Sequence, residues 1–341
     1  MRRWIKVALT AVAVLGVGGY VAEPWIRDEV LVQRACDGAL PREAVRQLLP
    51  DGAHLASAES RRTAGLGSYS CRVTLEGDEV RDHRLVDVAA WTRRDDQDRE
   101  FMAVFPEGGF ARQAPLPKGL PGFIDRFGAI QLRLDCPGLG KDAEGRQRTL
   151  LMRTSLGRDT LTGVPGAAYG TVAALANGIS QRLGCGAKPL TAPGKDTPPA
   201  DIEDDPKTVP LARAKDTSCA WAADAGLPAD GGWRLAALRN PAAPTGRCDL
   251  YSGTDEQSGG AAHQLSFVAW YGDWSNRLAS HDGERSPMTA TARCDGEAAN
   301  YALSAGDDIP GLGRAERRRL LTAFAEDEAR RHGCSGLRYS S

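Results

Sequence analysis

Eight cysteines constrain the fold of this chain more than any other feature of its sequence, because they fall into two sets of four. The sets are Cys36, Cys71, Cys136 and Cys185, then Cys219, Cys248, Cys294 and Cys334. The chain contains no Cys-x-x-Cys pair, which argues against a zinc ribbon and against a thioredoxin-like redox motif. An even number of cysteines beyond an export signal is typical of structural disulfides.

The two sets are surrounded by matching landmarks in the same order. A tryptophan closes a strand-like segment after the second cysteine of each set, at Trp91 and at Trp270. The third cysteines open Cys136-Pro-Gly and Cys294-Asp-Gly, and Val164-Pro-Gly and Ile309-Pro-Gly each precede a closing helix. Those helices end in Arg-Leu-Gly-Cys185 and Arg-His-Gly-Cys334. Repeated landmarks in a fixed order predict duplication and divergence of one module.

This organisation predicts disulfides within each module, although the sequence alone does not fix their connectivity. We expect Cys36–Cys71 to tie an opening helix to a strand and Cys136–Cys185 to tie a strand to the closing helix. We expect Cys219–Cys248 and Cys294–Cys334 to repeat that scheme in the second module.

The fold class we expect is α+β, with two tandem domains at 31–187 and 216–341. Each would be an antiparallel sheet packed with a short N-terminal and a longer C-terminal helix, linked by disulfides. Between them, residues 188–215 are rich in proline and predict a semi-extended linker.

Local patterns place some of these elements. Leu40-Pro41 begins the short helix, and the segments 71–75, 86–91, 130–136 and 265–270 read as strands, with 101–105 and 149–153 as further candidates. Apolar residues spaced by three and four from Tyr169 to Leu183 predict the first closing helix. The second closing helix carries Arg317-Arg318-Arg319 interleaved with Glu316, Glu326, Asp327 and Glu328, which we interpret as a solvated face.

The first 30 residues predict a membrane attachment. Arg2, Arg3 and Lys6 precede an uncharged run over 7–22, so the N-terminus would stay in the cytoplasm while the rest crosses the membrane. We expect a single-pass anchor followed by a tether over 23–32, with the ectodomain outside the cytoplasm. A signal peptide cleaved after Gly18, which would give a secreted protein, is the competing interpretation.

The layout resembles a group of known proteins. The carrying motifs are a cysteine before Leu40-Pro-Arg-Glu43, then Ser-Tyr-Ser-Cys71, and a closing Leu-Ala-Asn-Gly-Ile-Ser-Gln-Arg-Leu-Gly-Cys185. It resembles uncharacterised membrane-anchored or secreted proteins of actinobacteria with a duplicated four-cysteine module, and is loosely similar to actinobacterial lipoprotein domains of unknown function. The resemblance implies location and an antiparallel sheet backed by helices, and it carries no activity and no site residues.

The sequence contains no motif for several kinds of binding and catalysis. Lysine and arginine total 43 against 44 acidic residues, so the basic footprint of a nucleic-acid binder is missing. The five histidines occur in no metal-binding spacing, no Gly-x-Ser-x-Gly elbow is present, and we predict neither a metal nor a cofactor. His332 aligns with Leu183 of the other module, which indicates a packing position.

Trp270-Tyr271-Gly-Asp-Trp274 is the one aromatic cluster of interest. Trp270 matches Trp91 and is expected in the core, while Trp274 and Tyr271 are candidates for contact with a partner. We expect a non-enzymatic extracytoplasmic binding or scaffolding protein at the cell envelope, with an envelope protein or glycan as partner. The alternative is an envelope hydrolase whose catalytic residues are dispersed in sequence, and one module could also serve only as a spacer.

Overall fold

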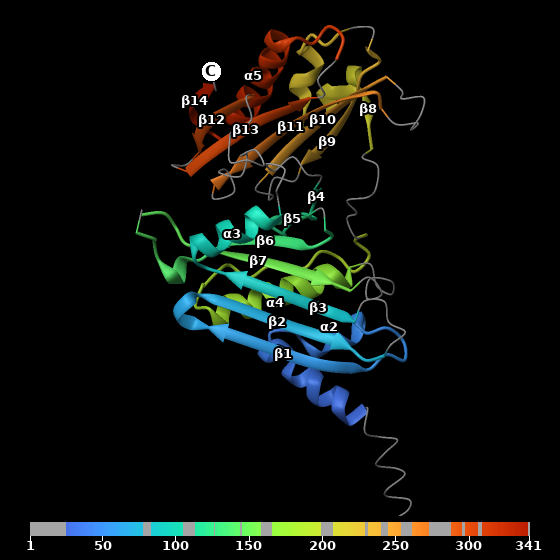
Figure 1. The fold of residues 1–341 in the computed structure, drawn as a ribbon, viewed down its shortest axis with the longest axis vertical. Helices are drawn as coiled ribbons and strands as arrows, with labels where there is room; N and C mark the ends of the chain where they lie inside the picture. The colour runs from blue at the N-terminus through green and yellow to red at the C-terminus, as the bar shows by residue number, and fades with distance from the viewer. Residues whose placement is uncertain are drawn as a thin grey trace, which may run out of the picture. The chain divides into compact units, whose positions relative to one another are not determined.

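The computed structural model describes residues 25–77, 83–104, 113–125, 127–143, 145–157, 166–198, 207–228, 231–239, 245–253, 261–272, 288–294, 297–305 and 309–339. It is an α+β structure with two antiparallel sheets (Figure 1). The chain divides into two compact units, Met1–Arg93 with Leu132–Pro199 and Arg94–Gln131 with Ala200–Ser341. The domain boundaries 31–187 and 216–341 stay a prediction, and residues 94–131 group with the second unit.

The first sheet has the strand order β1-β2-β3-β7-β6-β5-β4. Alternation of apolar and polar residues places one side of β2 in the core, where Cys71, Val73 and Leu75 are buried. The predicted strands at 71–75, 86–91 and 149–153 are present, and the strand predicted over 130–136 ends one residue earlier, at Asp135. The strands are β1 (Leu55–Thr63), β2 (Ser68–Leu75), β3 (Arg84–Trp91), β4 (Ala114–Pro115), β5 (Gly122–Ile124), β6 (Ile130–Asp135) and β7 (Thr149–Leu156).

The first unit also contains α-helices and 3-10 turns. A helix over 25–34 comes first, followed by the 3-10 turn η1 (Ala35–Gly38) and by α2 (Arg42–Leu48), which buries Val45 and Leu48. The closing helix α4 (Ala167–Arg182) buries Tyr169, Val172, Ala176 and Ile179, the apolar stripe expected from the sequence. Two residues beyond its end lies Gly184, whose φ of 68° is the left-handed conformation that glycine adopts at low cost. Two further 3-10 turns are η2 (Ala64–Leu66) and η3 (Pro137–Leu139).

The second sheet has the order β14-β12-β13-β11-β10-β9-β8 and is accompanied by α5 (Arg314–Arg331), which lies along β12 and β13 (Figure 1). Phe267 of β11 and Phe324 of α5 approach with ring centroids 5.5 Å apart, at the centre of this core. The strands are β8 (Val209–Pro210), β9 (Arg234–Arg239), β10 (Thr245–Ser252), β11 (His263–Tyr271), β12 (Thr289–Cys294), β13 (Glu297–Ala305) and β14 (Ser335–Tyr339); η5 (Leu211–Asp216) and η6 (Ala220–Asp224) precede β9.

Part of the strand order is common to both sheets: β1-β2-β3-β7-β6 in the first corresponds to β9-β10-β11-β13-β12 in the second. The registers also correspond. Cys71 pairs with Val88, three residues before Trp91, and Cys248 pairs with Phe267, three residues before Trp270. The duplication itself stays a prediction.

All four disulfides have the predicted connectivity: Cys36–Cys71, Cys136–Cys185, Cys219–Cys248 and Cys294–Cys334. Each bridge joins residues of one predicted module, and no cysteine remains free. Each therefore closes a loop inside its own module and restricts the unfolded chain locally.

One predicted strand is wrong. Residues 101–104 belong to the helix α3 (Arg94–Val104), and Phe105 lies outside the described residues. A short apolar run does not distinguish a strand from a helix by its periodicity. Asp95 and Asp96 in the first turn favour the helix, because negative side chains interact well with the N-terminal end of the helix dipole.

The linker over 188–215 was expected to be semi-extended, but its described parts form hydrogen bonds with a neighbouring helix and a neighbouring strand. The side chain of Asn177 bonds both the backbone N–H and the carbonyl of Leu190, at 2.8 and 2.9 Å, and the Gly166 N–H donates to the Lys195 carbonyl. Further along, Val209–Pro210 forms β8, paired with β9. The backbone N–H and carbonyl groups of a proline-rich segment still need hydrogen-bond partners, and here the neighbouring helix and strand provide them. These parts of the linker therefore lie against the fold.

The predicted anchor over 7–22 lies outside the described residues. Within the described part of the chain, no helix is both long enough and apolar enough to cross a membrane.

Candidate functional site

Tyr271 is the candidate binding residue that the structure describes, and it lies at the end of β11. The alternation of that strand sends Leu265, Phe267 and Ala269 into the core beside α5, and Tyr271 follows on the same side, partly buried. Trp270 points to the opposite face and is fully buried, as expected from its match to Trp91. Trp274 lies outside the described residues.

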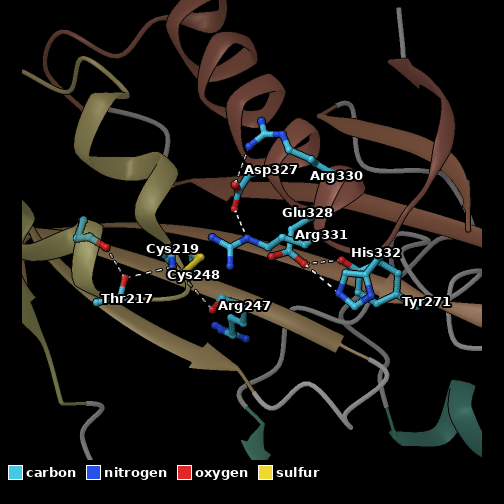
Figure 2. A network of polar contacts seen from close by, with 11 residues as sticks. Thr217, Cys219, Arg247, Cys248, Tyr271, Asp327, Glu328, Arg330, Arg331 and His332 are labelled. Carbon is cyan, nitrogen blue, oxygen red and sulfur yellow. Dashed lines mark hydrogen bonds and ion pairs between the residues drawn. A yellow bond between two sulfur atoms is a disulfide. The ribbon is translucent and has the colours of Figure 1, made fainter.

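Tyr271 meets two side chains from the last turn of α5 (Figure 2). Its hydroxyl donates a hydrogen bond to Oε2 of Glu328, and its ring stacks on the imidazole of His332 with centroids 3.9 Å apart and planes inclined by 27°. Nε2 of His332 lies 3.8 Å from Oε2 of Glu328. Glu328 and His332 are four residues apart on the helix, which places them on one face.

Glu328 is only 2% exposed, so its carboxyl group is held inside the protein. Burying a carboxylate is costly unless hydrogen bonds and a nearby positive charge compensate. The Tyr271 hydroxyl provides the hydrogen bond, and the partly exposed His332 provides a group that is positive when protonated. The three side chains therefore form one interdependent cluster, which we call the Tyr-Glu-His cluster.

Glycine at position 246 makes room for the carboxyl group. A Cβ atom at Gly246 of β10 would lie 2.8 Å from Oε2 of Glu328 and 3.4 Å from its Cδ, closer than side chains normally approach. Any other residue would have to displace the buried carboxyl group.

Tyr301 of β13 closes the other side of the cluster. It is fully buried, and its ring meets that of Tyr271 edge-on at 6.2 Å. Its hydroxyl donates to Sγ of Cys334 at 3.6 Å. Burial, and to a smaller extent the charge of Glu328, raise the pKa of Tyr301 well above its ordinary value.

The last turn of α5 has the same geometry as the last turn of α4. The N–H groups of His332, Gly333 and Cys334 bond the carbonyls of residues 328, 330 and 329, as those of Leu183, Gly184 and Cys185 bond the carbonyls of residues 179, 181 and 180. Glu328 therefore corresponds to Ile179 and His332 to Leu183.

The neighbouring strand shows the same exchange. Gly246 pairs with Ala269 one residue before Trp270, and Tyr69 pairs with Ala90 one residue before Trp91, so Gly246 corresponds to Tyr69. Tyr69 is buried and donates its hydroxyl to the Cys36 carbonyl at 2.7 Å. The second unit thus has a polar cluster and a glycine where the first unit has two aliphatic side chains and a bulky tyrosine.

Further charges lie near the cluster (Figure 2). Asp327, on the same turn of α5, pairs with Arg331 at 2.7 Å and with Arg330 at 3.5 Å. On the other face of the sheet, Arg247 and Asp249 form an ion pair at 2.8 Å in which both side chains are buried.

The interpretation of α5 as a solvated face is wrong for two of its acidic residues, since Asp327 and Glu328 are buried. The apolar stripe of α5 is buried as the sequence predicts, and Glu328 lies next to its last member; the stripe consists of Leu320, Leu321, Phe324, Ala325 and Ala329. The signal that could have found Glu328 is its alignment with Ile179, since a charged residue at a core position of the other module needs partners.

Three other histidines belong to the described residues. Nδ1 of His54 contacts Asp28 at 2.7 Å, His83 is exposed, and His263 begins β11. Among the described residues, no group of three or more His, Cys, Asp or Glu side chains could hold a metal ion.

Comparison of the chain with protein-family models, with curated proteins and with solved structures found no match.

Proposed function

We propose that this chain is a non-enzymatic binding or scaffolding protein of the cell envelope that contacts its partner through the second unit. The disulfides support the location, because all eight cysteines are paired and such bridges persist in oxidising compartments outside the cytoplasm. The membrane anchor and the duplicated module are parts of this proposal.

The observation that carries the proposal is the fixation of Tyr271 by Glu328 and His332. A hydrogen bond and a ring stack hold the residue that begins Tyr271-Gly-Asp-Trp274, and binding residues work best when a rigid structure supports them. Large aromatic side chains are enriched among residues that dominate binding energy. Trp274, three residues beyond this fixed point in sequence, is therefore our candidate for partner contact.

The comparison between the units supports assigning the contact to the second one. The first unit has the buried Ile179 and the partly buried Leu183 at the places of Glu328 and His332, and these aliphatic side chains need no polar partner. Maintaining a buried carboxyl group in the second unit costs free energy that a spacer would not require.

An envelope protein or a glycan is the kind of partner we propose. Both offer surfaces on which an aromatic side chain can pack while polar neighbours form hydrogen bonds. The net charge of -1 gives no attraction for nucleic acid.

In-cell crosslinking of the tagged full-length protein, followed by mass spectrometry, tests this function. A reproducible envelope partner should be captured by the natural protein and by Leu66→Ala, a control at an exposed apolar residue of the first unit, and lost with Trp274→Ala. Capture that persists unchanged in Trp274→Ala would reject the assigned contact.

An envelope hydrolase is the second candidate, because the phenol of Tyr271 meets a carboxyl group and an imidazole from the end of α5, 57 or more residues further along the chain. Such groups can exchange protons with a substrate. Purified protein should then release soluble fragments from cell-wall material, and His332→Ala should abolish the release while Leu66→Ala keeps it. Equal release by both variants would reject this candidate.

A further inference from the structure

Three large apolar side chains are exposed on one helix, described from residue 25 to residue 34. Trp25, Ile26 and Val30 are 68%, 62% and 42% exposed, and all three belong to the helix over 25–34. Among the described residues, only Leu66 and Phe127 are otherwise counted as large exposed apolar side chains. A cluster of this kind indicates a contact surface more strongly than scattered apolar residues do.

The helix is docked on the first unit, whereas the sequence analysis expects only a tether over 23–32. Asp28 accepts hydrogen bonds from the Leu55 N–H at 2.8 Å and contacts Nδ1 of His54 at 2.7 Å. Arg27 pairs with Glu76 at 2.6 Å and donates to the Ala56 carbonyl at 2.9 Å.

The next residue extends the docking to α2. Glu29 pairs with Arg42 at 2.9 Å and with Arg46 at 3.2 Å. Three consecutive residues of the helix thus contact both α2 and the beginning of β1. Such a set of contacts fixes the orientation of the helix on the unit.

Ile26 and Val30 lie on the side that the docking leaves open, whereas Trp25 meets the ring of His54 edge-on, with centroids 5.4 Å apart, and keeps 68% of its surface exposed. Ile26 and Val30 are four residues apart and share one face of the helix, whereas Val32 is buried. Ile26 and Val30 are therefore not part of the core of the first unit, and we expect them to pack against another apolar phase.

The sequence indicates that this apolar phase is a lipid bilayer. The uncharged run over 7–22 ends three residues before Trp25, and tryptophan is enriched where a membrane-spanning segment meets water. We infer that Trp25, Ile26 and Val30 lie in the interface of the lipid bilayer, and that the docked helix holds the first unit against the membrane in a fixed orientation. This inference rests on the proposed membrane anchor.

A fixed orientation predicts which end of the first sheet faces lipid. The helix docks at Leu55, where β1 begins, so the neighbouring exposed Asp51 lies on the membrane side. Leu66 lies beyond the other end of β1, a strand of nine residues that spans roughly 30 Å.

Fluorescence quenching in vesicles tests this arrangement. Because every native cysteine is disulfide-bonded, a single new cysteine can be labelled selectively with an environment-sensitive dye. The full-length variants Ile26→Cys, Asp51→Cys and Leu66→Cys would be reconstituted in phosphatidylcholine–phosphatidylglycerol vesicles, with and without lipids carrying a nitroxide quencher at the headgroup.

We expect strong quenching at positions 26 and 51 and at least twofold weaker quenching at position 66. Adding Asp28→Ala should release the unit, so that quenching at position 51 falls to the level of position 66 while position 26 stays quenched.

Each other outcome overturns the inference in a distinguishable way. Quenching at position 26 alone would leave the anchor in place and show a flexible tether. A protein that does not remain with the vesicles would reject the anchor itself. A dye at position 26 that is shielded without lipid quenching, together with crosslinks between copies, would show that a second copy covers this surface.

Discussion

Replacing Tyr271 by phenylalanine removes one hydroxyl group and leaves the ring that stacks on His332 in place. The lost interaction is a hydrogen bond from the hydroxyl to a carboxyl group that is 2% exposed. Hydrogen bonds to buried charged groups contribute about 1.5–3 kcal/mol, so we expect the free energy of unfolding to fall by that amount. For a unit of this size the midpoint temperature should fall by about 3–12 °C.

The control is the matching substitution at Tyr301, which is buried in the same core. Its hydroxyl contacts the Cys334 sulfur at 3.6 Å, and sulfur is a weak acceptor, so Tyr301→Phe should cost less than about 1 kcal/mol. The free energy of unfolding of both variants would be measured by denaturant titration of the disulfide-bonded protein, with circular dichroism as the signal.

A double-mutant cycle isolates the interaction. In a Glu328→Leu background, Tyr271 has lost this acceptor, and removing its hydroxyl should change the free energy of unfolding by less than about 0.5 kcal/mol. The coupling energy should then exceed about 1 kcal/mol, within the range found for contacting residues. An equal cost of Tyr271→Phe in both backgrounds would refute the cluster as described.

Three further predictions concern other parts of the fold. Gly246→Ala should destabilise the protein by about 1–3 kcal/mol in denaturant unfolding, because its Cβ would lie 2.8 Å from Oε2 of Glu328, and most of the loss should disappear in a Glu328→Ala background. Burial, with a smaller effect of a nearby aspartate, raises the pKa of Tyr69 from 10 to about 12. The folded state therefore favours the protonated phenol, so this contribution is complete below pH 10 and is lost as the pH rises to about 12, a change of roughly 3 kcal/mol. Alkaline unfolding of Tyr69→Phe should show a shallower dependence on pH, and an unchanged slope would contradict the assignment. Removing the Cys136–Cys185 bridge, which spans 49 residues, by alanine at both positions should cost about 4 kcal/mol from loop entropy; a loss below about 1 kcal/mol would show that the unfolded chain is already restricted.

The sequence determined the covalent frame and the outline of both sheets. Alternation along 71–75 and 130–135 identifies strands because neighbouring side chains point to opposite faces, and this rule depends only on local geometry. The order of the cysteines among repeated landmarks led to the expected pairing that all four bridges have, although four cysteines within one module allow three pairings. Tyr271 was likewise a candidate from its sequence context.

Only the tertiary structure decided how the remaining parts are used. Glu328 and Tyr271 are 57 residues apart, and no local pattern indicates that a charged residue of α5 turns inward to meet a strand. The helix over 25–34 reads as a tether in sequence, yet its charged residues find partners on α2 and β1. In both cases the deciding interaction is a hydrogen bond or an ion pair between distant segments. Such an interaction forms only when the chain has folded, so the local sequence does not reveal it.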